Sequence, residues 1–446
     1  MMFNRSLMIS LVAGAAMCPL AHAQSYSNVL GDPGFTGSYV AKFASFDDGT
    51  GESLYATGSF SIPGASGGSN IAKWDGASWV AVSGGLVSNY SSTMATYQGN
   101  LFVGGYFGSA NGVSGSAKLA MYDGSAWSSM DAQLDSFLSS VWAMTTHDDG
   151  SGDALIVAGN YLDIGGNAGM NHISKWDGSG YTALGGTIGG AVPLIVLDVL
   201  SADLGGGSTL FAGGRFLTIG AASANNIAQW DGSAWSPLGG GLTRTSGFAQ
   251  VFHMTPWDDG TGMALYVGGS FNLGDGSTVL ANVAKWDGSV WSTLGAGFNS
   301  AVQELTVFDD GSGEALYAMG NFVTSGTTAV EHIAKWNGSA WEAVGSGADG
   351  TVFGAFVFDA GEGEALIMGG GFDTVDGMGA HHVVSLLSEA SCQADFTGDG
   401  ELNFFDVSAF LAAFSAAQPE GDFNGDGLYN FFDVSAFLAA FSAGCP

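Results

Sequence analysis

From residue 38 to residue 388, short apolar runs alternate with polar, glycine-rich segments, and the pattern repeats about every fifty residues. The clearest copy contains the runs Ala264–Phe271, Val283–Gly288 and Trp291–Gly295. Each run is short, rich in aromatic and β-branched residues and bounded by turn residues, which predicts β-strands. Six copies carry one aromatic residue before Asp-Gly or Asn-Gly and a second one soon after it, at Trp74/Trp79, Tyr122/Trp127, Trp176/Tyr181, Trp230/Trp235, Trp286/Trp291 and Trp336/Trp341.

Each copy predicts four antiparallel strands, with the Asp-Gly turn between the third and the fourth. Four short strands in a unit of this length are typical of a β-propeller blade. A seventh copy begins at Val352 and lacks its fourth strand. The segment Ser27–Gly31 resembles the missing strand, with Ser27 in the position of the Trp. We therefore predict an all-β domain over residues 24–388, a seven-bladed β-propeller of four-stranded blades closed by an N-terminal strand.

A different pattern follows residue 388. The segment Asn403–Ala416 recurs without change as Asn430–Ala443. Its apolar residues are spaced as on one face of an α-helix. We therefore predict a small α-helical C-terminal domain, residues 389–446, with two loop–helix units whose apolar faces are Val407, Phe410, Leu411 and Phe414 in the first copy and Val434, Phe437, Leu438 and Phe441 in the second.

Acidic and amide side chains precede each predicted helix at the spacing of an EF-hand-type calcium loop, and a glycine stands at the sharp turn (Gly400 and Gly427). The alternative, a pair of Asx turns without metal, does not explain why the whole set occurs twice. We predict two Ca²⁺ ions, with Glu401 and Leu428 contributing backbone carbonyls. The predicted ligands are Asp395, Thr397, Asp399, Glu401, Asn403 and Asp406 in the first loop, and Asp422, Asn424, Asp426, Leu428, Asn430 and Asp433 in the second.

The first 23 residues have the features of a signal peptide for export. Arg5 precedes the apolar segment Leu7–Met17, and Ala21–Ala23 fits the cleavage site. Removal of this segment leaves Cys392 and Cys445, which bracket the C-terminal domain. In an oxidising compartment we expect them to form a disulfide, the alternative being two free or intermolecularly paired thiols. No later apolar run is long enough for a membrane helix, so we expect no membrane insertion.

The charge balance restricts the partners. The chain of 446 residues has 9 Lys and Arg against 41 Asp and Glu, a formal net charge of −32. Nucleic acids and anionic lipids require basic patches, so neither is expected as a partner. Hydrophobic residues make up 46% of the chain, which excludes intrinsic disorder.

Most candidate functional residues of the predicted propeller recur once per copy, which favours a structural role. The acidic turns, such as Asp258–Gly260, could bind calcium on one rim or simply stabilise hairpins. The repeated lysines, such as Lys285, are expected to pair with nearby acids. The residue before the third strand is Asn70, Lys118, His172, Asn226, Asn282, His332 or His382. Its three histidines could suggest a metal, but we favour capping of backbone groups.

Four residues depart from the repeat. Trp142 and Trp257 lie on first strands and are candidates for a surface or channel contact. His253 and Glu304 fall at matching first-strand positions and could face the central channel. Convergence of unlike polar residues at one place in that channel would favour an enzyme. The chain lacks the His-Glu-x-x-His and Walker motifs.

The Gly-Gly strand followed by the Asp-Gly and Trp pair resembles the repeat of kelch-like propellers, over roughly four-fifths of the chain. This resemblance implies the fold, which hosts many unrelated activities. No cysteine lies in the repeats, so the Cys–Tyr cross-link of kelch-like copper oxidases is excluded.

The duplicated loop–helix unit resembles a dockerin module, of the type that ends in Gly-Cys in exported proteins of planctomycete-like bacteria. The resemblance implies that the module anchors or sorts its protein at the cell surface. The positions that govern recognition in this family are Phe404, Phe405, Phe431 and Phe432 here, where cellulosomal dockerins usually have polar residues. The expected receptor is therefore a cell-surface protein other than a cellulosomal cohesin.

These expectations combine into an exported, non-enzymatic propeller, displayed at the cell surface through its calcium-dependent module. The propeller would bind a protein or glycan ligand through its variable loops. The alternative is an extracellular polysaccharide-active enzyme, a glycosidase or lyase, with carboxylates at the channel.

Overall fold

The computed structural model describes residues 25–31, 34–64, 69–134, 136, 138–190, 193–361, 363–388, 394, 396–397, 402–416, 418, 421–423 and 428–443. The chain divides into two compact units, one over Gln24–Glu389 and one that includes Ala390–Pro446. The predicted signal peptide, residues 1–23, lies outside the described residues, as do Cys392 and Cys445 of the predicted disulfide.

The first unit contains seven four-stranded antiparallel sheets in its described residues. The first strands of the sheets are β2 (Thr36–Asp47), β7 (Tyr90–Tyr97), β12 (Val141–Asp148), β17 (Ile195–Asp203), β24 (Gln250–Asp258), β30 (Val302–Asp309) and β36 (Val352–Asp359). The second strands are β3 (Glu52–Ser61), β8 (Asn100–Tyr106), β13 (Asp153–Gly159), β18 (Ser208–Arg215), β25 (Met263–Ser270), β31 (Glu314–Gly320) and β37 (Glu364–Gly370).

The third and fourth strands are shorter. The third strands are β4 (Ser69–Trp74), β10 (Leu119–Tyr122), β14 (Ile173–Trp176), β21 (Ile227–Trp230), β28 (Val283–Trp286), β34 (Ile333–Trp336) and β40 (Val383–Leu387). The fourth strands are β5 (Trp79–Ala81), β11 (Trp127–Ser129), β15 (Tyr181–Ala183), β22 (Trp235–Pro237), β29 (Trp291–Thr293), β35 (Trp341–Ala343) and β1 (Tyr26–Ser27).

The loops between sheets, and between second and third strands, form small sheets of their own. These are β6–β9 (Leu86–Val87, Ser109–Ala110), β16–β19–β20 (Ile188–Gly189, Thr218–Ile219, Ala222–Ser223), β23–β26–β27 (Leu242–Thr243, Leu273–Gly274, Thr278–Val279), β32–β33 (Thr324–Ser325, Thr328–Ala329) and β38–β39 (Thr374–Val375, Met378–Gly379). A single 3₁₀ turn, Val29–Gly31, follows β1.

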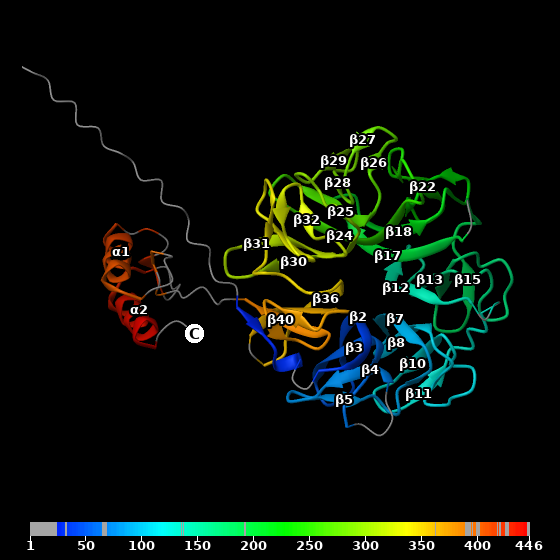
Figure 1. Ribbon diagram of the computed structural model, residues 1–446, viewed down its shortest axis with the longest axis horizontal. Helices are drawn as coiled ribbons and strands as arrows, with labels where there is room; N and C mark the ends of the chain where they lie inside the picture. Colours follow the sequence, from blue (N-terminus) through cyan, green and yellow to red (C-terminus); the bar gives the residue numbers. More distant parts are fainter. Residues whose placement is uncertain are drawn as a thin grey trace, which may run out of the picture. The chain divides into compact units, whose positions relative to one another are not determined.

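The sheets stand around a common centre (Figure 1), with the first strand of each sheet innermost. Each first strand contacts the first strand of the next sheet along the chain, and β36 contacts β2, so these contacts close into a circuit. A circle of four-stranded antiparallel sheets is the architecture of a β-propeller. The predicted β-propeller fold is therefore confirmed. The core lies between neighbouring sheets, where their apolar faces meet.

The repeated Gly-Gly of the second strands has a geometric cause at each glycine. The first glycine faces the next sheet: a Cβ on Gly268 would lie 2.6 Å from Cγ1 of Val302. The second glycine lies opposite a β-bulge in the first strand of its own sheet. A Cβ on Gly269 would lie 2.2 Å from the carbonyl oxygen of Gln250. Only glycine leaves room for both approaches.

All seven first strands have this bulge at the same place. The ladder shifts register by one residue after Val40, Ser91, Val141, Val196, Val251, Val302 and Val352. A bulge re-aims the side chains that follow it. The residue after each bulge, here named the ring position, therefore occupies one level around the centre.

The second aromatic residue of each repeat ties neighbouring sheets together. The indole N–H of Trp291 donates to the carbonyl oxygen of Leu238 at 3.1 Å, and that of Trp341 donates to Leu294 at 3.0 Å. Trp79, Trp127, Tyr181 and Trp235 make the same bond to the preceding sheet. Packing between sheets accounts for their strict repetition.

The N-terminal strand β1 is the fourth strand of the sheet that contains β36, β37 and β40. The prediction that Ser27 takes the Trp position is wrong by one residue. Tyr26 is paired with Leu386 of the third strand, just as Trp291 is paired with Trp286 in the sheet that begins with β24. Tyr26 therefore occupies the position of the second aromatic residue. The Tyr26 hydroxyl also donates to the carbonyl oxygen of Val344 at 3.1 Å, as the tryptophans do elsewhere. One additional residue separates Tyr26 from Leu30, so a fixed sequence spacing misplaced the aromatic.

The described residues of the C-terminal unit form two helices, α1 (Phe404–Ser415) and α2 (Phe431–Ala443). Equivalent residues of the two copies pack on each other, because the rings of Phe410 and Phe437 stack with their centroids 4.1 Å apart. Leu411 and Leu438, predicted on the apolar faces, are about half exposed. Phe410 and Phe437 fill the small core, and the leucines one residue later point away from it.

Candidate functional sites

The ring positions carry seven different residues, unlike the Gly-Gly pairs, the paired aromatics and the valines before the bulge. In order around the centre they are Lys42, Thr93, Ala143, Asp198, His253, Glu304 and Gly354. The valines before the bulge have the same packing role in six sheets, and the ring position has no such common role. The polar ring positions of β2, β17, β24 and β30 form the channel cluster, defined as Lys42, Asp198, His253 and Glu304.

Glu304 is the centre of the channel cluster. Its side chain is almost wholly buried and receives Nζ of Lys42 on one oxygen and Nε2 of His253 on the other, the latter at 2.9 Å. The backbone N–H of Leu305 donates to Nδ1 of His253 at 3.3 Å, which leaves the proton of a neutral imidazole on Nε2, facing Glu304. Burial acts to raise the pKa of Glu304, but its interactions with His253 and Lys42 outweigh burial and lower it.

Asp198 is the second carboxyl group of the channel cluster. Its Oδ2 accepts the backbone N–H of Met254 at 2.7 Å. Burial raises the pKa of Asp198, and the attraction of His253 and Lys42 only partly offsets this. The two carboxyl groups of one cluster therefore have pKa values displaced in opposite directions, Asp198 upward and Glu304 downward.

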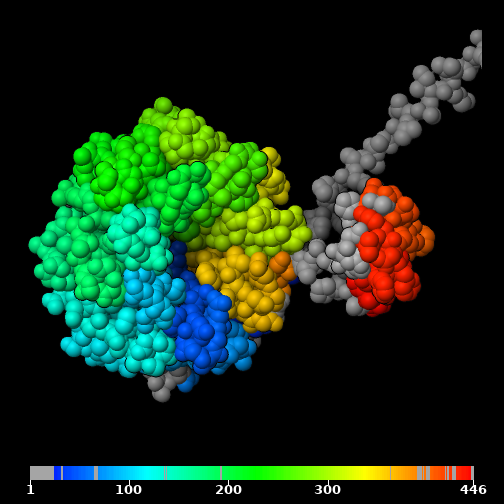
Figure 2. Space-filling model, turned by 180° about the vertical axis from the view of Figure 1, so that it is seen from behind, coloured from blue at the N-terminus to red at the C-terminus, as the bar shows by residue number. Residues whose placement is uncertain are grey.

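Lys42 reaches Glu304 across an intervening sheet, because β36 lies between β2 and β30 in the circuit. The ring position of β36 is Gly354, and a Cβ there would lie 2.3 Å from the carbonyl oxygen of Ala41. The close approach of β2 thus requires glycine. Figure 2 shows the ring hollowed at its centre on one face.

Sequence reasoning had placed His253 and Glu304 at matching first-strand positions, and the structure brings them into contact. It missed Lys42 and Asp198. A signal for both was available: each charged residue stands two positions after a valine, in Val40–Lys42, Val196–Asp198, Val251–His253 and Val302–Glu304. The bulge between the two residues, which aligns these pairs, is not visible in the sequence.

Aromatic side chains lie beside the small ring positions. Tyr39 and Phe353, from neighbouring sheets, have ring centroids 5.2 Å apart, and Tyr90 and Trp142 have theirs 5.8 Å apart. Burial and the nearby phenol of Tyr90 raise the pKa of Tyr39 to about 12. All four side chains are partly exposed. These residues, Tyr39, Tyr90, Trp142 and Phe353, are named the aromatic arc and come from the consecutive sheets of β36, β2, β7 and β12.

The repeated polar residues have structural roles. Before the third strand, the seven residues have φ between 66° and 78°, a left-handed conformation that asparagine tolerates well. Asn282 accepts from the backbone of Phe271 and donates to that of Phe298. The predicted capping is therefore confirmed for the asparagines. Among the described residues, no group of three or more His, Cys, Asp or Glu could hold a metal ion.

The acidic turns satisfy their own carboxylates. Asp258 accepts the backbone N–H groups of Gly260 and Gly262, each at 2.9 Å. Asp259 receives Nζ of Lys285 at 2.6 Å and the hydroxyl of Thr261. Equivalent ion pairs join Lys73 to Asp48, Lys175 to Asp149 and Lys335 to Asp310. The predicted pairing of the repeated lysines is confirmed, and hairpin stabilisation explains the acidic turns.

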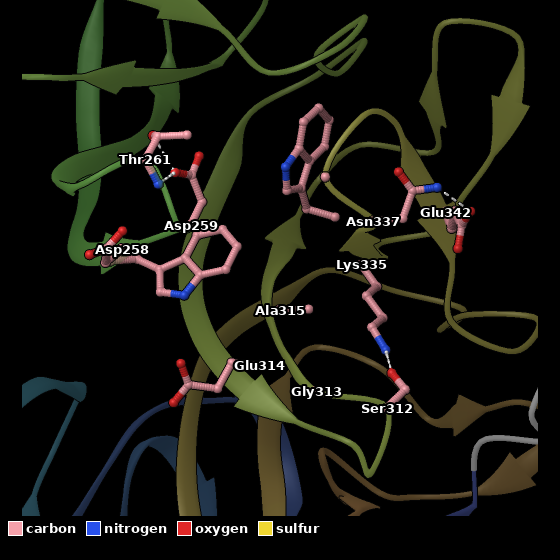
Figure 3. Close-up of a pocket in the computed structure, with 13 residues that line it drawn as sticks. Asp258, Asp259, Thr261, Ser312, Gly313, Glu314, Ala315, Lys335, Asn337 and Glu342 are labelled. Atoms are coloured by element: carbon pink, nitrogen blue, oxygen red, sulfur yellow. Dashed lines mark hydrogen bonds between the residues drawn. The ribbon is translucent and has the colours of Figure 1, made fainter. Parts of the chain in front are cut away.

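A pocket of about 580 Å³ lies between two sheets beside these turns (Figure 3). Several of its polar lining residues are paired with one another: Lys335 donates to Ser312, and Asn337 to Glu342. Similar pockets beside Lys175 and Lys73 recur between other sheets. Trp257 lines the first pocket. Because the pocket recurs with the repeat, we ascribe it to blade packing rather than to a single ligand.

In the C-terminal unit, the structure describes seven of the predicted calcium ligands, Thr397, Asn403, Asp406, Asp422, Leu428, Asn430 and Asp433. The other five, Asp395, Asp399, Glu401, Asn424 and Asp426, lie outside the described residues. Thr397 and Asp406 are brought together, with the threonine hydroxyl 2.8 Å from the carboxylate.

Asp406 and Asp433 are completely buried. Each accepts the backbone N–H of the asparagine three residues before it, Asn403 or Asn430, at 2.8 Å. Each asparagine in turn accepts a backbone N–H of the first helical turn. Asn403 and Asp406, both predicted calcium ligands, therefore also form a capping box at the start of α1. Asn430 and Asp433 make the equivalent two bonds at the start of α2.

Four phenylalanines at the starts of these helices are exposed to solvent. Phe404, Phe405, Phe431 and Phe432 retain between 68% and 76% of their possible exposure. The rings of each adjacent pair have the same spacing, 6.4 Å, in both copies. Exposed aromatic residues at equivalent positions of a duplicated unit are typical of an interaction surface.

No protein-family model matches the chain, and no curated protein matches it in sequence. Similar solved structures include the extracellular domain of a putative one-component system from B. thetaiotaomicron, with 12% identity and a TM-score of 0.48 over 82% of this chain and 40% of that one. YCF48 from Cyanidioschyzon merolae has 12% identity and a TM-score of 0.41, over 79% and 97% of the two chains. A GH74 enzyme of Niastella koreensis has 13% identity and a TM-score of 0.35, over 79% and 60%.

The chain thus spans less than half the length of the first of these proteins. The fold assignment rests on the sheet topology described above. No helix among the described residues is both long and apolar enough to cross a membrane.

Proposed function

We propose that the chain is an exported, non-enzymatic binding protein, displayed or sorted at the cell surface through its C-terminal module. In this proposal residues 1–23 are a signal peptide, residues 24–388 a seven-bladed kelch-like propeller closed by β1, and residues 389–446 a dockerin-like module. Pairing of β1 with β40, which joins the two ends of the repeat region, supports the closure.

The exposed phenylalanine pairs are the observation that supports display. The core around Phe410 and Phe437 is small. Four large aromatic side chains that stay in water add no hydrophobic stabilisation to it. Their exposure is explained if Phe404, Phe405 and their counterparts in α2 are buried against a surface protein. The chain's partner would then supply an apolar groove for two equivalent aromatic pairs.

Two calcium ions would organise this module. The predicted ligand set consists of oxygen atoms, as calcium requires. The described residues fit that role: the carboxylate of Asp406 is fully enclosed and lies within 2.8 Å of the Thr397 hydroxyl, as two ligands of one cation would. A disulfide between Cys392 and Cys445 would tie the ends of the module together.

The mature chain, used as bait on cell-envelope proteins with calcium or with chelator, tests this function. We expect one partner, captured only with calcium, and loss of capture when Phe404, Phe405, Phe431 and Phe432 are all changed to Ser. The matched control carries the same change at Leu411 and Leu438, which are also exposed but lie elsewhere on the helices. Capture that the phenylalanine variant retains would refute the proposal.

A second candidate function, a polysaccharide-active glycosidase or lyase, is favoured by the channel cluster alone. Unlike polar residues from four sheets converge there, and opposite displacement of two carboxyl pKa values is a pattern of acid–base pairs. Release of new sugar ends from polysaccharides by the wild-type chain, abolished in Asp198→Asn, would establish this function. Its absence from a broad set of polysaccharides would leave binding as the function.

A further inference from the structure

The centre of the ring is the place where this molecule departs from its own repeat. The glycines, second aromatics and acidic turns recur from sheet to sheet and hold the sheets together. The channel cluster and the aromatic arc occur once, on first strands that share the same bulge. Packing between sheets does not require a polar side chain at the ring position, because β12 has Ala143 there and β36 has Gly354.

The channel cluster has hydrogen-bonding capacity left over. The ammonium group of Lys42 has three donors, one of which Glu304 takes, and its side chain is one-third exposed. Oδ1 of Asp198 accepts no hydrogen bond from the described residues. The cluster can therefore both donate to and accept from the hydroxyl groups of a ligand.

The aromatic arc lies on the other part of the circuit. Its four residues come from β36, β2, β7 and β12, whereas Asp198, His253 and Glu304 come from β17, β24 and β30. The ring positions Thr93, Ala143 and Gly354 beside the arc are small, so their side chains take up little space. Nε1 of Trp142 is a buried donor without a hydrogen-bond partner among the described residues, a state it shares with Nε1 of Trp74, Trp230 and Trp257.

Charge selects among possible ligands. Lys42 and Glu304 neutralise each other, so the hollow offers no net positive charge to an anion. The whole chain carries −32, which repels acidic polymers at long range. A cationic ligand would be repelled by the partly exposed ammonium group of Lys42 and is therefore disfavoured. An uncharged ligand with many hydroxyl groups and a flat apolar face fits the donors, the acceptors and the arc together.

We propose that the central hollow binds a neutral sugar unit of a glycan, with the channel cluster hydrogen-bonding its hydroxyl groups and the aromatic arc packing on its C–H face. This inference rests on the proposed binding function and names its ligand class. It also moves the ligand site from the variable loops, where the sequence had suggested it, to the first strands.

Titration of the full mature chain with short neutral oligosaccharides of glucose, galactose, mannose and xylose tests the inference, with tryptophan fluorescence and ligand-observed NMR as readouts. We expect at least one series to bind below about 1 mM, and oligosaccharides of uronic acids not to bind. Trp142→Leu and Asp198→Asn should each weaken binding about tenfold. Lys285→Met, which breaks an ion pair at an acidic turn, is the matched control and should leave binding unchanged.

Three results would overturn the inference: no binding of any neutral series up to about 10 mM, equal binding by the two variants and the wild type, or preference for charged sugars. Because Asp198→Asn removes a partly buried carboxyl, Trp142→Leu provides a second variant if the first does not fold. If no oligosaccharide binds but the calcium-dependent surface partner is still captured, the proposed display at the cell surface stands and only the sugar site is excluded. Sugar binding without that partner would refute display and keep the ligand site.

Discussion

The hydroxyl of Tyr26 donates to the carbonyl oxygen of Val344, which lies 318 positions later in the sequence. The bond joins β1 to the end of β35, in the sheet that begins with β30. Tryptophans make the same bond between other neighbouring sheets. We expect Tyr26→Phe to lower the free energy of unfolding by about 1 kcal/mol, since one partly buried hydrogen bond is lost while the ring remains. Urea unfolding of the mature chain measures the change.

Deletion of residues 24–31 should have a larger effect, because it removes β1 from its pairing with β40 and exposes the edge of that sheet. The matched control is Asn28→Ala, a partly exposed residue within the same segment. A deleted chain with unchanged unfolding would contradict closure of the ring by β1.

The second glycine of the Gly-Gly pair is predicted to be intolerant of any side chain. Gly269→Ala would place a Cβ 2.2 Å from the carbonyl oxygen of Gln250, so the bulge that sets the ring position of His253 would have to move. We expect a loss of about 2–3 kcal/mol, as for an overpacked core. Thermal unfolding against Gly206→Ala, where a Cβ meets no atom within 4 Å, separates this clash from the general effect of replacing glycine.

The sequence was sufficient to predict the β-propeller because the strand pattern, the Asp-Gly turns and the paired aromatics all repeat with one period. It also placed His253 and Glu304 at equivalent positions. It did not identify the channel cluster as a unit, because Lys42 and Glu304 are joined only when the circle closes. Tyr26 was missed for a related reason: its position is fixed by a hydrogen bond to Val344 rather than by spacing from Leu30.

The ion pairs of the acidic turns should make stability depend on pH. Burial raises the pKa of Asp48, but hydrogen bonds from Lys73, Thr50 and Tyr55 outweigh it and hold the pKa at about 2. A folded-state pKa below that of the unfolded chain stabilises the fold above about pH 4, and this stability is lost as pH falls toward 2. We expect Lys73→Met to cost on the order of 2 kcal/mol at pH 7 and little at pH 2.

Urea midpoints measured across this pH range test the prediction. The control is Glu52→Gln, an exposed carboxylate near the same turn, whose loss should change stability little at any pH. A Lys73→Met chain whose deficit is equally large at pH 2 and at pH 7 would show that the lysine acts through packing of its alkyl chain rather than through Asp48.

Calcium should stabilise the C-terminal module without affecting the propeller. A cation present at about 100 times its dissociation constant adds about 2.7 kcal/mol to the stability of the state that binds it. We therefore expect chelation to accelerate amide hydrogen exchange throughout α1 and α2 and to leave exchange in the propeller strands unchanged. Magnesium should not restore protection, because it requires a smaller and more regular ligand shell.

Two roles of Asp406 and Asp433 can be separated in the same experiment. Both residues cap their helices through the backbone of Asn403 and Asn430, a role that does not itself require a metal. Asp406→Asn keeps an acceptor oxygen for the cap but removes the charge that a calcium ligand needs. If calcium binds, α1 of this variant should exchange like α1 of the chelated wild type whether or not calcium is added. If chelation leaves the wild-type helices equally protected, the two aspartates are helix caps only and the predicted calcium sites are wrong.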